Sequence, residues 1–449
     1  MLIKDFTVLR DLISPWRMSN LFFFRPLDGF SLDSRAMRPG QGFVAVKGQL
    51  CDGHDFIAQA VRRGASCVIS QRYIKLNPRV PLFVVQDSYR ALAQIAGFIR
   101  RQRNPYVYAV TGSVGKTTTK DMLAFLLRDE CLLLKSPKTE NNILGVAKAM
   151  FALQDEDTAV LELGTNHPGE IAALADIVRP DVGIITFIKP SHLEGFKTLR
   201  GVFKEKVSLL NANSRMKVVL NADDPYLSRV RSGKNIFWFG TNKRNDIYAK
   251  FIEHRGNTSV FLVQDKYRLI LATPFDDLIY NALAAILAAS LRGIAVKDLV
   301  AKMNAFIDFS ALRMQINDSG RFRIINDAYN SNPYSFSQAV KVARRFARPR
   351  IAVVGDMLEL GAKTEYYHRL MAKDIINADF DYCLTLGTYT RYLGRQLKAS
   401  GYHNVFHFSR HKDIADFINK KVVDKSLVFL KGSRRMALEK VVEALERAG

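Results

Sequence analysis

The segment 111–118, which reads Thr-Gly-Ser-Val-Gly-Lys-Thr-Thr, constrains the fold more than any other part of the chain. It follows the apolar residues 106–110 and precedes the amphipathic residues 121–127, which is the order strand, glycine loop and helix. Backbone N–H groups at a helix start cradle an anion, a lysine meets phosphate charge, and a following hydroxyl can ligate Mg²⁺. Val110 stands where the usual GxxxxGK[ST] loop has its first glycine, so the loop is short. An ordinary strand-to-helix turn remains the alternative. We predict a phosphate cradle made of Gly112, Ser113, Val114, Gly115, Lys116, Thr117 and Thr118.

The length of 449 residues predicts two or three domains, since a single hydrophobic core stops growing near 250–300 residues. The longest strongly apolar stretch, residues 282–291, is far shorter than the roughly 20 residues that span a bilayer. Residues 1–16 lack the pattern of a secretory signal. The four cysteines are scattered without metal-ligand spacing, which indicates neither zinc nor disulfides. We therefore expect a cytoplasmic enzyme without a transmembrane segment.

The formal net charge of +23 is compatible with nucleic acid, an anionic membrane surface or phosphorylated substrates as partners. The basic residues are spread along the chain, and the densest segment, 341–350, reads as a solvated helix face. Since no nucleic-acid-binding module accompanies them, we expect no nucleic acid partner. Peripheral association with the inner membrane face stays open.

Three blocks of alternating strands and helices predict an α/β protein of three domains. Residues 1–104 form a small α/β block, residues 105–312 a mostly parallel sheet of P-loop type, and residues 313–449 a second, Rossmann-like α/β unit. The polar segment 100–105 ends in proline and is interpreted as a linker.

Two polar residues follow strands of the central block. Glu162 ends one predicted strand, and His192 comes shortly after another. Because ligands sit outside the carboxyl ends of strands in open α/β sheets, both side chains could face the glycine loop. A carboxylate, an imidazole and a threonine hydroxyl would suit Mg²⁺ carrying nucleotide phosphates. Each residue taken alone reads equally well as a solvated or structural side chain.

An ordered series of motifs resembles the Mur ligase family, over residues 28–447. Within that family, the resemblance is greatest to members that add a D-alanyl-D-alanine dipeptide. The first block contributes DSRAMRPGQGFVAVKG (33–48) and DGHDF (52–56). The later motifs are TGSVGKTT (111–118), ENNILGV (140–146), ELGTNHPGEI (162–171), HLEGF (192–196), DAYNSNP (327–333), GDMLELG (355–361) and KGS (431–433).

The resemblance implies an ATP-dependent amide ligase of peptidoglycan synthesis. ATP would phosphorylate the terminal carboxylate of a UDP-linked muramoyl tripeptide, and the amine of D-alanyl-D-alanine would attack that acyl phosphate. A carboxylate is a poor electrophile, because its charge repels nucleophiles and oxide is a poor leaving group. Phosphorylation removes both difficulties, while metal and lysine neutralise the charge that gathers during transfer.

The resemblance also implies roles for single residues. Lys116 would hold the β- and γ-phosphates, Thr117 and Glu162 would ligate a first Mg²⁺, and His192 a second. The family uses a carbamylated lysine as a bridging ligand 14 residues after that histidine, which here is Lys206, with Lys204 as the alternative. Such a lysine needs a lowered pKa to react with CO₂.

Other site residues are implied in all three blocks. Arg313 resembles a hinge arginine, while Asp327, Tyr329 and Asn330 resemble a nucleotide-contacting motif of the third domain, which would close onto ATP. DAYNSNP also reads as a strand-to-helix turn, and both interpretations can hold. The candidate substrate-binding residues are Asn141 and Asn142 in the second block and Ser34, Arg35 and Lys47, toward UDP, in the first.

The chain departs from the family pattern near the nucleotide base. Asp277 and Leu278 stand where the family has a His-Asn pair that helps to hold adenine, and Phe187 and Val114 replace polar residues. Two alternatives remain: a Mur-type ligase with another acceptor, and a basic binding protein switched by nucleotide. We expect a monomer, and the third residue of the tripeptide has no readable code.

Overall fold

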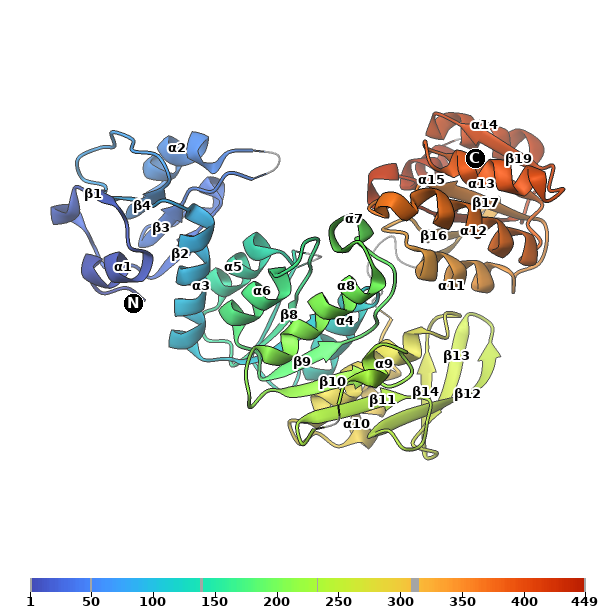
Figure 1. Ribbon diagram of the computed structural model, residues 1–449, viewed down its shortest axis with the longest axis horizontal. Helices are drawn as coiled ribbons and strands as arrows, with labels where there is room; N and C mark the ends of the chain where they lie inside the picture. Colours follow the sequence, from blue (N-terminus) through green and yellow to red (C-terminus); the bar gives the residue numbers. More distant parts are fainter. Residues whose placement is uncertain (1, 49–50, 138–139, 232, 308–314, 448–449) are drawn as a thin grey trace.

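The computed structural model describes residues 2–48, 51–137, 140–231, 233–307 and 315–447, which form three α/β domains in a row (Figure 1). Each domain has its own sheet, of five, nine and six strands in chain order. The predicted three-domain α/β architecture is therefore confirmed. Among the described residues, no helix is long and apolar enough to cross a membrane.

The N-terminal sheet has the order β1-β5-β4-β3-β2 and is parallel except for its edge strand β1. Its strands are β1 (Arg17–Ser19), β2 (Gly29–Ser31), β3 (Gln41–Val44), β4 (Cys67–Ser70) and β5 (Leu82–Val84), and its helices are α1 (Phe6–Ile13), α2 (Ile57–Arg62) and α3 (Ser88–Arg103). Helix α3 also packs on two helices of the central domain, and so joins the two domains.

The interpretation of residues 100–105 as a linker was wrong for its first part. Helix α3 continues to Arg103 and ends at Asn104, whose backbone is left-handed (φ 46°). Arg100 is buried, and its guanidinium donates to the carbonyl oxygens of Val178 (2.7 Å) and Arg179 (3.1 Å). These carbonyls lie at the end of a central-domain helix, so a cation there is favourable.

The central sheet has the order β14-β13-β12-β11-β10-β9-β6-β8-β7. Its strands are β6 (Tyr106–Thr111), β7 (Leu133–Lys135), β8 (Thr158–Glu162), β9 (Val182–Ile185), β10 (Lys217–Asn221), β11 (Ile236–Gly240), β12 (Ile247–Arg255), β13 (Thr258–Val263) and β14 (Tyr267–Leu271). The strands from β7 to β12 are parallel, as predicted, but β12, β13 and β14 continue the sheet as an antiparallel extension that the sequence analysis did not anticipate.

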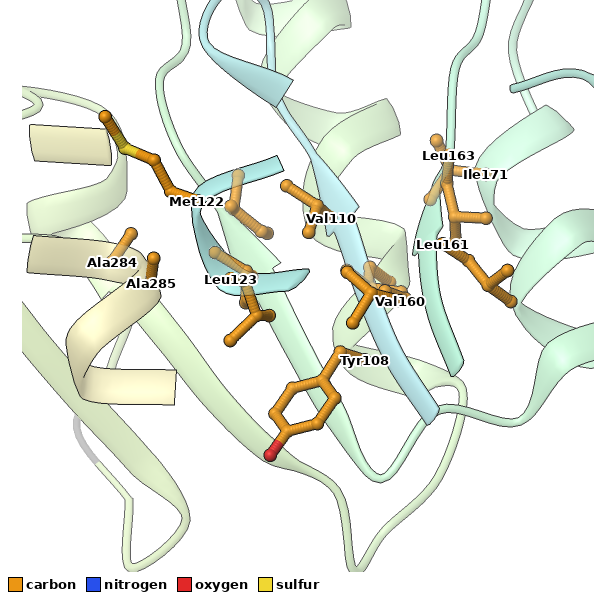
Figure 2. Packing of buried hydrophobic residues seen from close by; sticks show 14 of the residues in the cluster. Tyr108, Val110, Met122, Leu123, Val160, Leu161, Leu163, Ile171, Ala284 and Ala285 are labelled. Atoms are coloured by element: carbon orange, nitrogen blue, oxygen red, sulfur yellow. The ribbon is translucent and has the colours of Figure 1, made fainter. Parts of the chain in front are cut away.

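The helices of this domain are α4 (Lys116–Leu127), α5 (Ile143–Ala152), α6 (Glu170–Val178), α7 (Leu193–Phe196), α8 (Leu199–Val207), α9 (Leu278–Ser290) and α10 (Val296–Met303). Strand β6 is central and buried on both faces, as a parallel strand covered by helices must be. Figure 2 shows Met122 and Leu123 of α4 beside Ala284 and Ala285 of α9. The small alanines let α9 pack closely on α4, and this rigid core fixes where the glycine loop begins.

The C-terminal sheet has the order β15-β16-β20-β17-β18-β19, and all pairs are parallel except β15–β16. Its strands are β15 (Gln315–Ser319), β16 (Phe322–Asp327), β17 (Arg350–Gly355), β18 (Tyr382–Leu386), β19 (Val405–Phe408) and β20 (Leu427–Lys431). Its helices are α11 (Pro333–Ala343), α12 (Thr364–Asn377), α13 (Thr390–Ala399), α14 (His411–Lys421) and α15 (Glu439–Glu446). The carboxyl ends of β16 and β20 bring Asp327 and Lys431 together on the side that faces the central domain.

Candidate active site

The glycine loop between β6 and α4 has a backbone that only glycine fits at two positions. Gly112 has φ +148° and Gly115 has φ +83°. A Cβ on Gly115 would lie 2.2 Å from Nδ2 of Asn281, and one on Gly112 would lie 2.0 Å from Oγ1 of Thr186. Both distances are far below van der Waals contact, so the turn requires glycine for space as well as for its dihedral angles.

The loop is held in place by the segment that follows β9. The Ser113 amide donates to the carbonyl of Phe187 (2.8 Å), and the Ser113 hydroxyl donates to the carbonyl of Lys189 (2.8 Å). The Thr186 hydroxyl donates to the carbonyl of Val114 (2.6 Å). From α9, Nδ2 of Asn281 donates to the carbonyl of Gly115 (3.1 Å). These hydrogen bonds fix the backbone of the loop without a ligand. The loop is therefore a preformed cradle at the start of α4.

Lys116 is the first residue of α4 and bends back over the loop. Its Nζ donates to the carbonyl oxygen of Gly112 at 2.9 Å. The side chain is only partly buried and lines the cavity described below. An ammonium group in this position adds a full positive charge to the partial charge of the helix N-terminus.

Thr117, Glu162 and Asn141 form a buried polar group beside the loop. The Thr117 hydroxyl donates to Oε2 of Glu162 at 2.6 Å, and Nδ2 of Asn141 donates to Oε1 of the same carboxylate at 2.8 Å. Thr117 and Glu162 are 2% and 1% exposed, so the carboxylate has almost no access to bulk water. A hydroxyl and a carboxylate are the hard oxygen donors that Mg²⁺ prefers, and these residues fit that ion together with phosphate and water ligands. Within the described ranges, no three His, Cys, Asp or Glu side chains cluster as a self-sufficient metal site.

Lys206 lies on α8 next to this group and is 1% exposed, whereas Lys204 is exposed to solvent. Within the part of the chain that the structure describes, the Lys206 amine makes no hydrogen bond. Burial, and secondarily the charge of Lys116, hold the pKa of Lys206 well below its ordinary value. A lowered pKa increases the fraction of the amine that is unprotonated and so able to act as a nucleophile.

The neighbouring Glu205 fixes the orientation of α8. Its carboxylate is buried and accepts hydrogen bonds from the backbone amides of Gly169 (2.7 Å) and Ile171 (2.8 Å), at the start of α6. The Thr165 hydroxyl also donates to it (3.1 Å). A carboxylate at a helix N-terminus is well stabilised, and Glu205 therefore holds Lys206 in register with the site.

His192 precedes α7 and has a left-handed backbone (φ 50°). Its Nδ1 lies 2.5 Å from Oε2 of Glu359, a residue of the C-terminal domain. The Glu359 carbonyl also accepts the amide of Glu194 (3.1 Å). The close contact with the His192 ring lowers the pKa of Glu359. Since Nδ1 lies against Glu359, a neutral His192 would have Nε2 available to bind a ligand.

A cavity of about 860 Å³ lies between the central and C-terminal domains. The predicted site residues that line it are Ser113, Val114, Gly115, Lys116, Thr117, Thr118, Asn141, Asn142, Glu162, His192, Asp327, Tyr329 and Asn330. The volume is that of a site for a nucleotide-sized ligand. Residues from five separate stretches of the sequence thus meet in one place.

The C-terminal wall of the cavity is made by the DAYNSNP segment and α11. Nζ of Lys431 forms a buried ion pair with Asp327 and donates to the carbonyl of Asn330 (3.1 Å). The Asn332 side chain caps α11 in a reciprocal capping box with Ser335. The segment is therefore a helix-capping turn, as the second interpretation predicted, while Asp327, Tyr329 and Asn330 still face the cavity.

An aromatic corner occupies the end of the cavity where the chain departs from the family pattern. The Phe187 ring lies 5.3 Å from the ring of Tyr280 and 5.7 Å from that of Tyr334, measured between centroids. The Tyr334 hydroxyl donates to Oδ2 of Asp277 at 2.6 Å. Nζ of Lys189 lies 4.6 Å from the Tyr334 centroid, a cation–π contact. Burial raises the pKa of Asp277.

The remaining candidates lie elsewhere. Gly112 and Lys206 do not line the cavity, and Arg313 falls outside the described residues. In the N-terminal domain, Ser34 is buried and its hydroxyl donates to Gln59 (2.6 Å), while exposed Arg35 pairs with Asp33 (2.8 Å). Lys47 is exposed. The contacts of these three residues with UDP stay a prediction. In the cavity wall, the Asn142 side chain caps α5 through the amide of Gly145 (3.0 Å).

Sequence reasoning assigned no role to Glu359, Asn281 or Tyr334. Glu359 lies in the GDMLELG motif, which carried the resemblance but offered no local reason for a contact with His192. Asn281 lies 166 residues from Gly115, to which it donates, and Tyr334 lies in a different domain from Asp277, to which it donates. The periodicity of helices and strands in the sequence carries no signal of such pairings.

Comparisons with known proteins bear on the whole chain. Three family models match it: Mur ligase family, catalytic domain, at residues 26–130; Mur ligase middle domain at 110–289; and Mur ligase, glutamate ligase domain, at 312–434. The UDP-N-acetylmuramoyl-tripeptide–D-alanyl-D-alanine ligase of Escherichia coli K12 is 31% identical over 434 residues, which cover 94% of each chain. The enzyme of the same name from Buchnera aphidicola (Acyrthosiphon pisum) is 30% identical, covering 92% of each.

Two solved structures show the same architecture. A crystal structure of MurF from Acinetobacter baumannii superposes with a TM-score of 0.89 at 26% identity, covering 99% of this chain and 98% of the other. MurF ligase from Thermotoga maritima in complex with ADP superposes with a TM-score of 0.83 at 27% identity, covering 93% and 97%. The likeness extends over all three domains.

Proposed function

The chain belongs to the Mur ligase family, and from this membership we propose that it joins D-alanyl-D-alanine to a UDP-N-acetylmuramoyl-tripeptide with the hydrolysis of ATP. It is an ATP-dependent ligase of peptidoglycan synthesis. The two relatives described above carry this activity in their names and match over more than nine-tenths of the chain.

One observation within the chain carries the proposal furthest. The glycine loop, the Thr117–Glu162 pair and His192 all line one cavity between two domains. Lys206 is buried and interacts electrostatically with Lys116 and Glu162 of that lining. A buried lysine beside a buried carboxylate is costly to maintain, because both groups lose hydration. A protein that only binds a nucleotide gains nothing that would offset this cost. This combination favours the ligase over the nucleotide-switched binding protein.

The charges of the site suit phosphoryl transfer to a carboxylate. The N–H groups at the start of α4 and the Lys116 ammonium group would receive the β- and γ-phosphates, which gather negative charge as the transfer proceeds. Thr117 and Glu162 would hold a first Mg²⁺, and Nε2 of His192 a second. Mg²⁺, when bound, neutralises phosphate charge and orients the phosphate oxygens.

Lys206 would serve as a carbamate. Its amine is buried, lacks a hydrogen bond within the described residues and has a lowered pKa, which are the conditions under which a lysine reacts with CO₂. The product is an anion with two oxygens, and it would compensate the positive charge of Lys116 nearby. Lys204 is solvent-exposed and lacks these conditions.

The C-terminal domain would complete the nucleotide site. Asp327, Tyr329 and Asn330 reach the cavity from β16, while Phe187 and Tyr334 offer ring faces to a nucleotide base at the aromatic corner. Closing the cavity from two sides excludes water, and the activated carboxylate is thereby protected from hydrolysis.

Phosphate release measured with ATP, Mg²⁺, UDP-muramoyl-tripeptide and D-alanyl-D-alanine, with each omitted in turn, tests the reaction. We expect release to require all four and the pentapeptide to appear by mass spectrometry. If phosphate is released without the dipeptide when single amino acids are supplied in its place, the chain is a ligase with another acceptor. Phosphate release that depends on no muramoyl substrate would overturn the proposal.

The carbamate has its own test. Protein kept in ¹³C-bicarbonate should give a carbamate carbon resonance that disappears in Lys206→Ala and persists in the matched variant Lys204→Ala. Short-chain carboxylic acids should partly restore activity to Lys206→Ala, because they supply the missing oxygens. A resonance that persists in Lys206→Ala would place the carbamate elsewhere.

A further inference from the structure

The N-terminal domain exposes large apolar side chains at the end of the molecule remote from the cavity. Phe22 is 94% exposed, Trp16 56%, Tyr73 46% and Phe23 41%. Solvent exposure of several aromatic side chains in one place is unfavourable in water and marks an interaction surface. In Figure 1, β1, which precedes the turn that carries Phe22, lies at the left end of the long axis, and the C-terminal domain lies at the right.

Two chain segments lie side by side to form this surface. Strand β1 pairs with β5, with Arg17 opposite Val84, and Nδ2 of Asn20 donates to the carbonyl of Val80 (3.1 Å). The Arg17 guanidinium lies 3.6 Å from the Tyr73 ring centroid. We call the exposed residues of the two segments the aromatic-basic face: Trp16, Arg17, Phe22, Phe23, Arg25, Tyr73, Lys75 and Arg79.

The turn that presents the two phenylalanines is firmly anchored. Asn20 has a left-handed backbone (φ 60°) that redirects the chain into the short 3₁₀ helix η1 (Leu21–Phe23). The next residue, Phe24, points inward, with its ring 6.4 Å from that of Phe6 and 6.1 Å from that of Phe83. One phenylalanine therefore holds the turn in the core while Phe22 and Phe23 are directed outward.

The charge of the aromatic-basic face is of one sign. Residues 12–27 and 71–86 contain five basic residues and no Asp or Glu. Within the described residues, Arg17, Arg25, Lys75 and Arg79 form no ion pair with a carboxylate, and Arg72 alone of the five pairs with one, Asp52 (2.7 Å). The surface is thus electrostatically complementary to a polyanion.

From this arrangement we infer that the aromatic-basic face docks the protein on the surface of an anionic lipid bilayer. Aromatic side chains favour the headgroup region, where a ring is buried, and each basic residue near an anionic surface adds attraction. A single-stranded nucleic acid fits less well, because the Phe22 and Phe23 rings meet edge to face at 89° and offer no common stacking platform.

Docking would leave the reaction site free. The predicted UDP-contacting residues Ser34 and Arg35 follow β2, which is the sheet edge opposite to β1. The cavity lies between the central and C-terminal domains. The membrane-docking surface is therefore separate from the residues that bind substrate, and its loss should leave the reaction in solution intact.

Fluorescence of Trp16 tests the inference in the full-length protein. The chain has two tryptophans, so Trp238→Phe leaves Trp16 as the sole reporter. Vesicles of phosphatidylglycerol and phosphatidylcholine should shift its emission to the blue, and brominated lipids should quench it. Pure phosphatidylcholine vesicles should do neither, and added salt should reverse the effect.

Variants separate the apolar from the electrostatic contribution. Phe22→Ser combined with Phe23→Ser should lower partitioning to the anionic vesicles by at least about tenfold, since apolar burial is lost. Arg25→Gln, Lys75→Gln and Arg79→Gln together should lower it by about fivefold per charge removed. Both should keep the reaction rate in solution within about twofold of the parent, consistent with the distance from the site.

Matched controls make the outcome decisive. Ile252→Ser with Val423→Ser removes apolar residues of 52% and 61% exposure elsewhere, and Arg244→Gln, Lys266→Gln and Lys297→Gln removes three exposed charges. Both should partition like the parent. Equal partitioning of all variants would overturn the inference. So would a protein that does not bind vesicles but binds a single-stranded oligonucleotide, if the Phe22 and Phe23 changes abolish that binding.

Discussion

The Thr117 hydroxyl donates to the buried carboxylate of Glu162, and this hydrogen bond brings together the two oxygens that we propose as Mg²⁺ ligands. We expect Thr117→Val to raise the Mg²⁺ concentration needed for half-maximal phosphate release by at least about tenfold, since one hard oxygen is removed and the carboxylate loses a partner. Titration of Mg²⁺ at saturating ATP measures this.

Thr117→Ser is the matched control, because it keeps the hydroxyl and removes one methyl group. It should need a Mg²⁺ concentration within about threefold of the parent. An equal defect in the Ser and Val variants would show that the threonine acts through packing and would contradict a ligand role for its oxygen.

His368 links pH to the segment that bears Glu359. Its Nε2 accepts the amide of Met357 (3.1 Å), and its Nδ1 donates to the carbonyl of Thr364 (2.7 Å), so the folded imidazole is neutral. Burial lowers the pKa of His368 below its ordinary value of 6.5. Below that pH the unfolded chain binds a proton that the folded chain rejects, and the free energy of unfolding therefore falls on acidification, by at most about 1.4 kcal/mol per pH unit.

His368→Gln should flatten this dependence, because the amide donates and accepts without titrating. His403→Gln, at an exposed histidine, should leave the slope unchanged. Denaturant unfolding between pH 7.5 and 5 measures the difference. A slope that persists in His368→Gln would assign the acid sensitivity to other groups.

Single residues were predictable where the chemistry is local. The loop glycines, Lys116, Thr117 and Glu162 follow from one strand–loop–helix pattern and one strand end. All of them except Gly112 line the cavity. The choice between Lys206 and Lys204 rested on spacing, and it depends physically on which helix face is buried. The packing of α8 against α6 determines which face is buried. The sequence around two lysines that are two residues apart does not indicate which of them lies on that face.

At the scale of elements, the sharp turn from β6 into α4 depends on Gly115. Gly115→Ala should destabilise the protein by at least about 3 kcal/mol, because a left-handed alanine costs 1–2 kcal/mol and its Cβ would also collide with Asn281. Gly293→Ala is a matched control, since Gly293 has a similar φ (+90°) and nothing within 4 Å of the added carbon. It should cost only the backbone part, about 1–2 kcal/mol.

Asn281→Ala separates the collision from the backbone strain. Combined with Gly115→Ala, it should recover part of the lost stability, so the two changes should be non-additive. Thermal unfolding of the four proteins measures the coupling. Strict additivity would show that Asn281 is not the group with which the new methyl collides.

Strands and helices of the three sheets were largely predictable, because buried parallel strands read as short apolar runs between helical segments. The linker proposal for residues 100–105 was wrong because an arginine-rich segment looks solvated, whereas Arg100 is held by two helix-end carbonyls. The antiparallel extension β12–β14 escaped notice because its alternation of exposed and buried residues is weak, with Phe251 and Ile252 both outward.

At the scale of the whole molecule, a few polar contacts hold the C-terminal domain against the central one. Arg345 of the C-terminal domain pairs with Asp276 (2.5 Å) and donates to the carbonyl of Pro274 (2.7 Å). Arg345→Ala should lower kcat by about tenfold, because the cavity closes less completely. It should also increase the radius of gyration in small-angle scattering.

Arg344→Ala is the matched control for that change. Arg344 precedes Arg345, is exposed, and forms no side-chain hydrogen bond or ion pair among the described residues. It should retain the parent kcat and radius of gyration, although both variants lose the same charge. A defect shared by the two variants would trace the effect to net charge and not to the domain contact.

The contacts between domains were the least predictable feature of the molecule. His192 and Glu359, or Asp277 and Tyr334, are far apart in sequence and meet only through domain packing. Each of these residues looks ordinary in its own element. Hydrophobic periodicity specifies which face of a helix is buried, but it contains no information on which polar residue of another domain will lie opposite.

The position of the cavity between two domains has a consequence for inhibitor discovery. A small molecule that touches Lys116 or Glu162 on one wall and Tyr334 or Lys431 on the other bridges two bodies, and so acts as a noncovalent crosslink. Because such a molecule binds only when both walls are in place, its binding free energy stabilises that one arrangement of the two domains. Compounds found by thermal stabilisation of the intact chain, and not of isolated domains, would therefore be selected for freezing the enzyme in a single shape, whether or not they resemble a nucleotide.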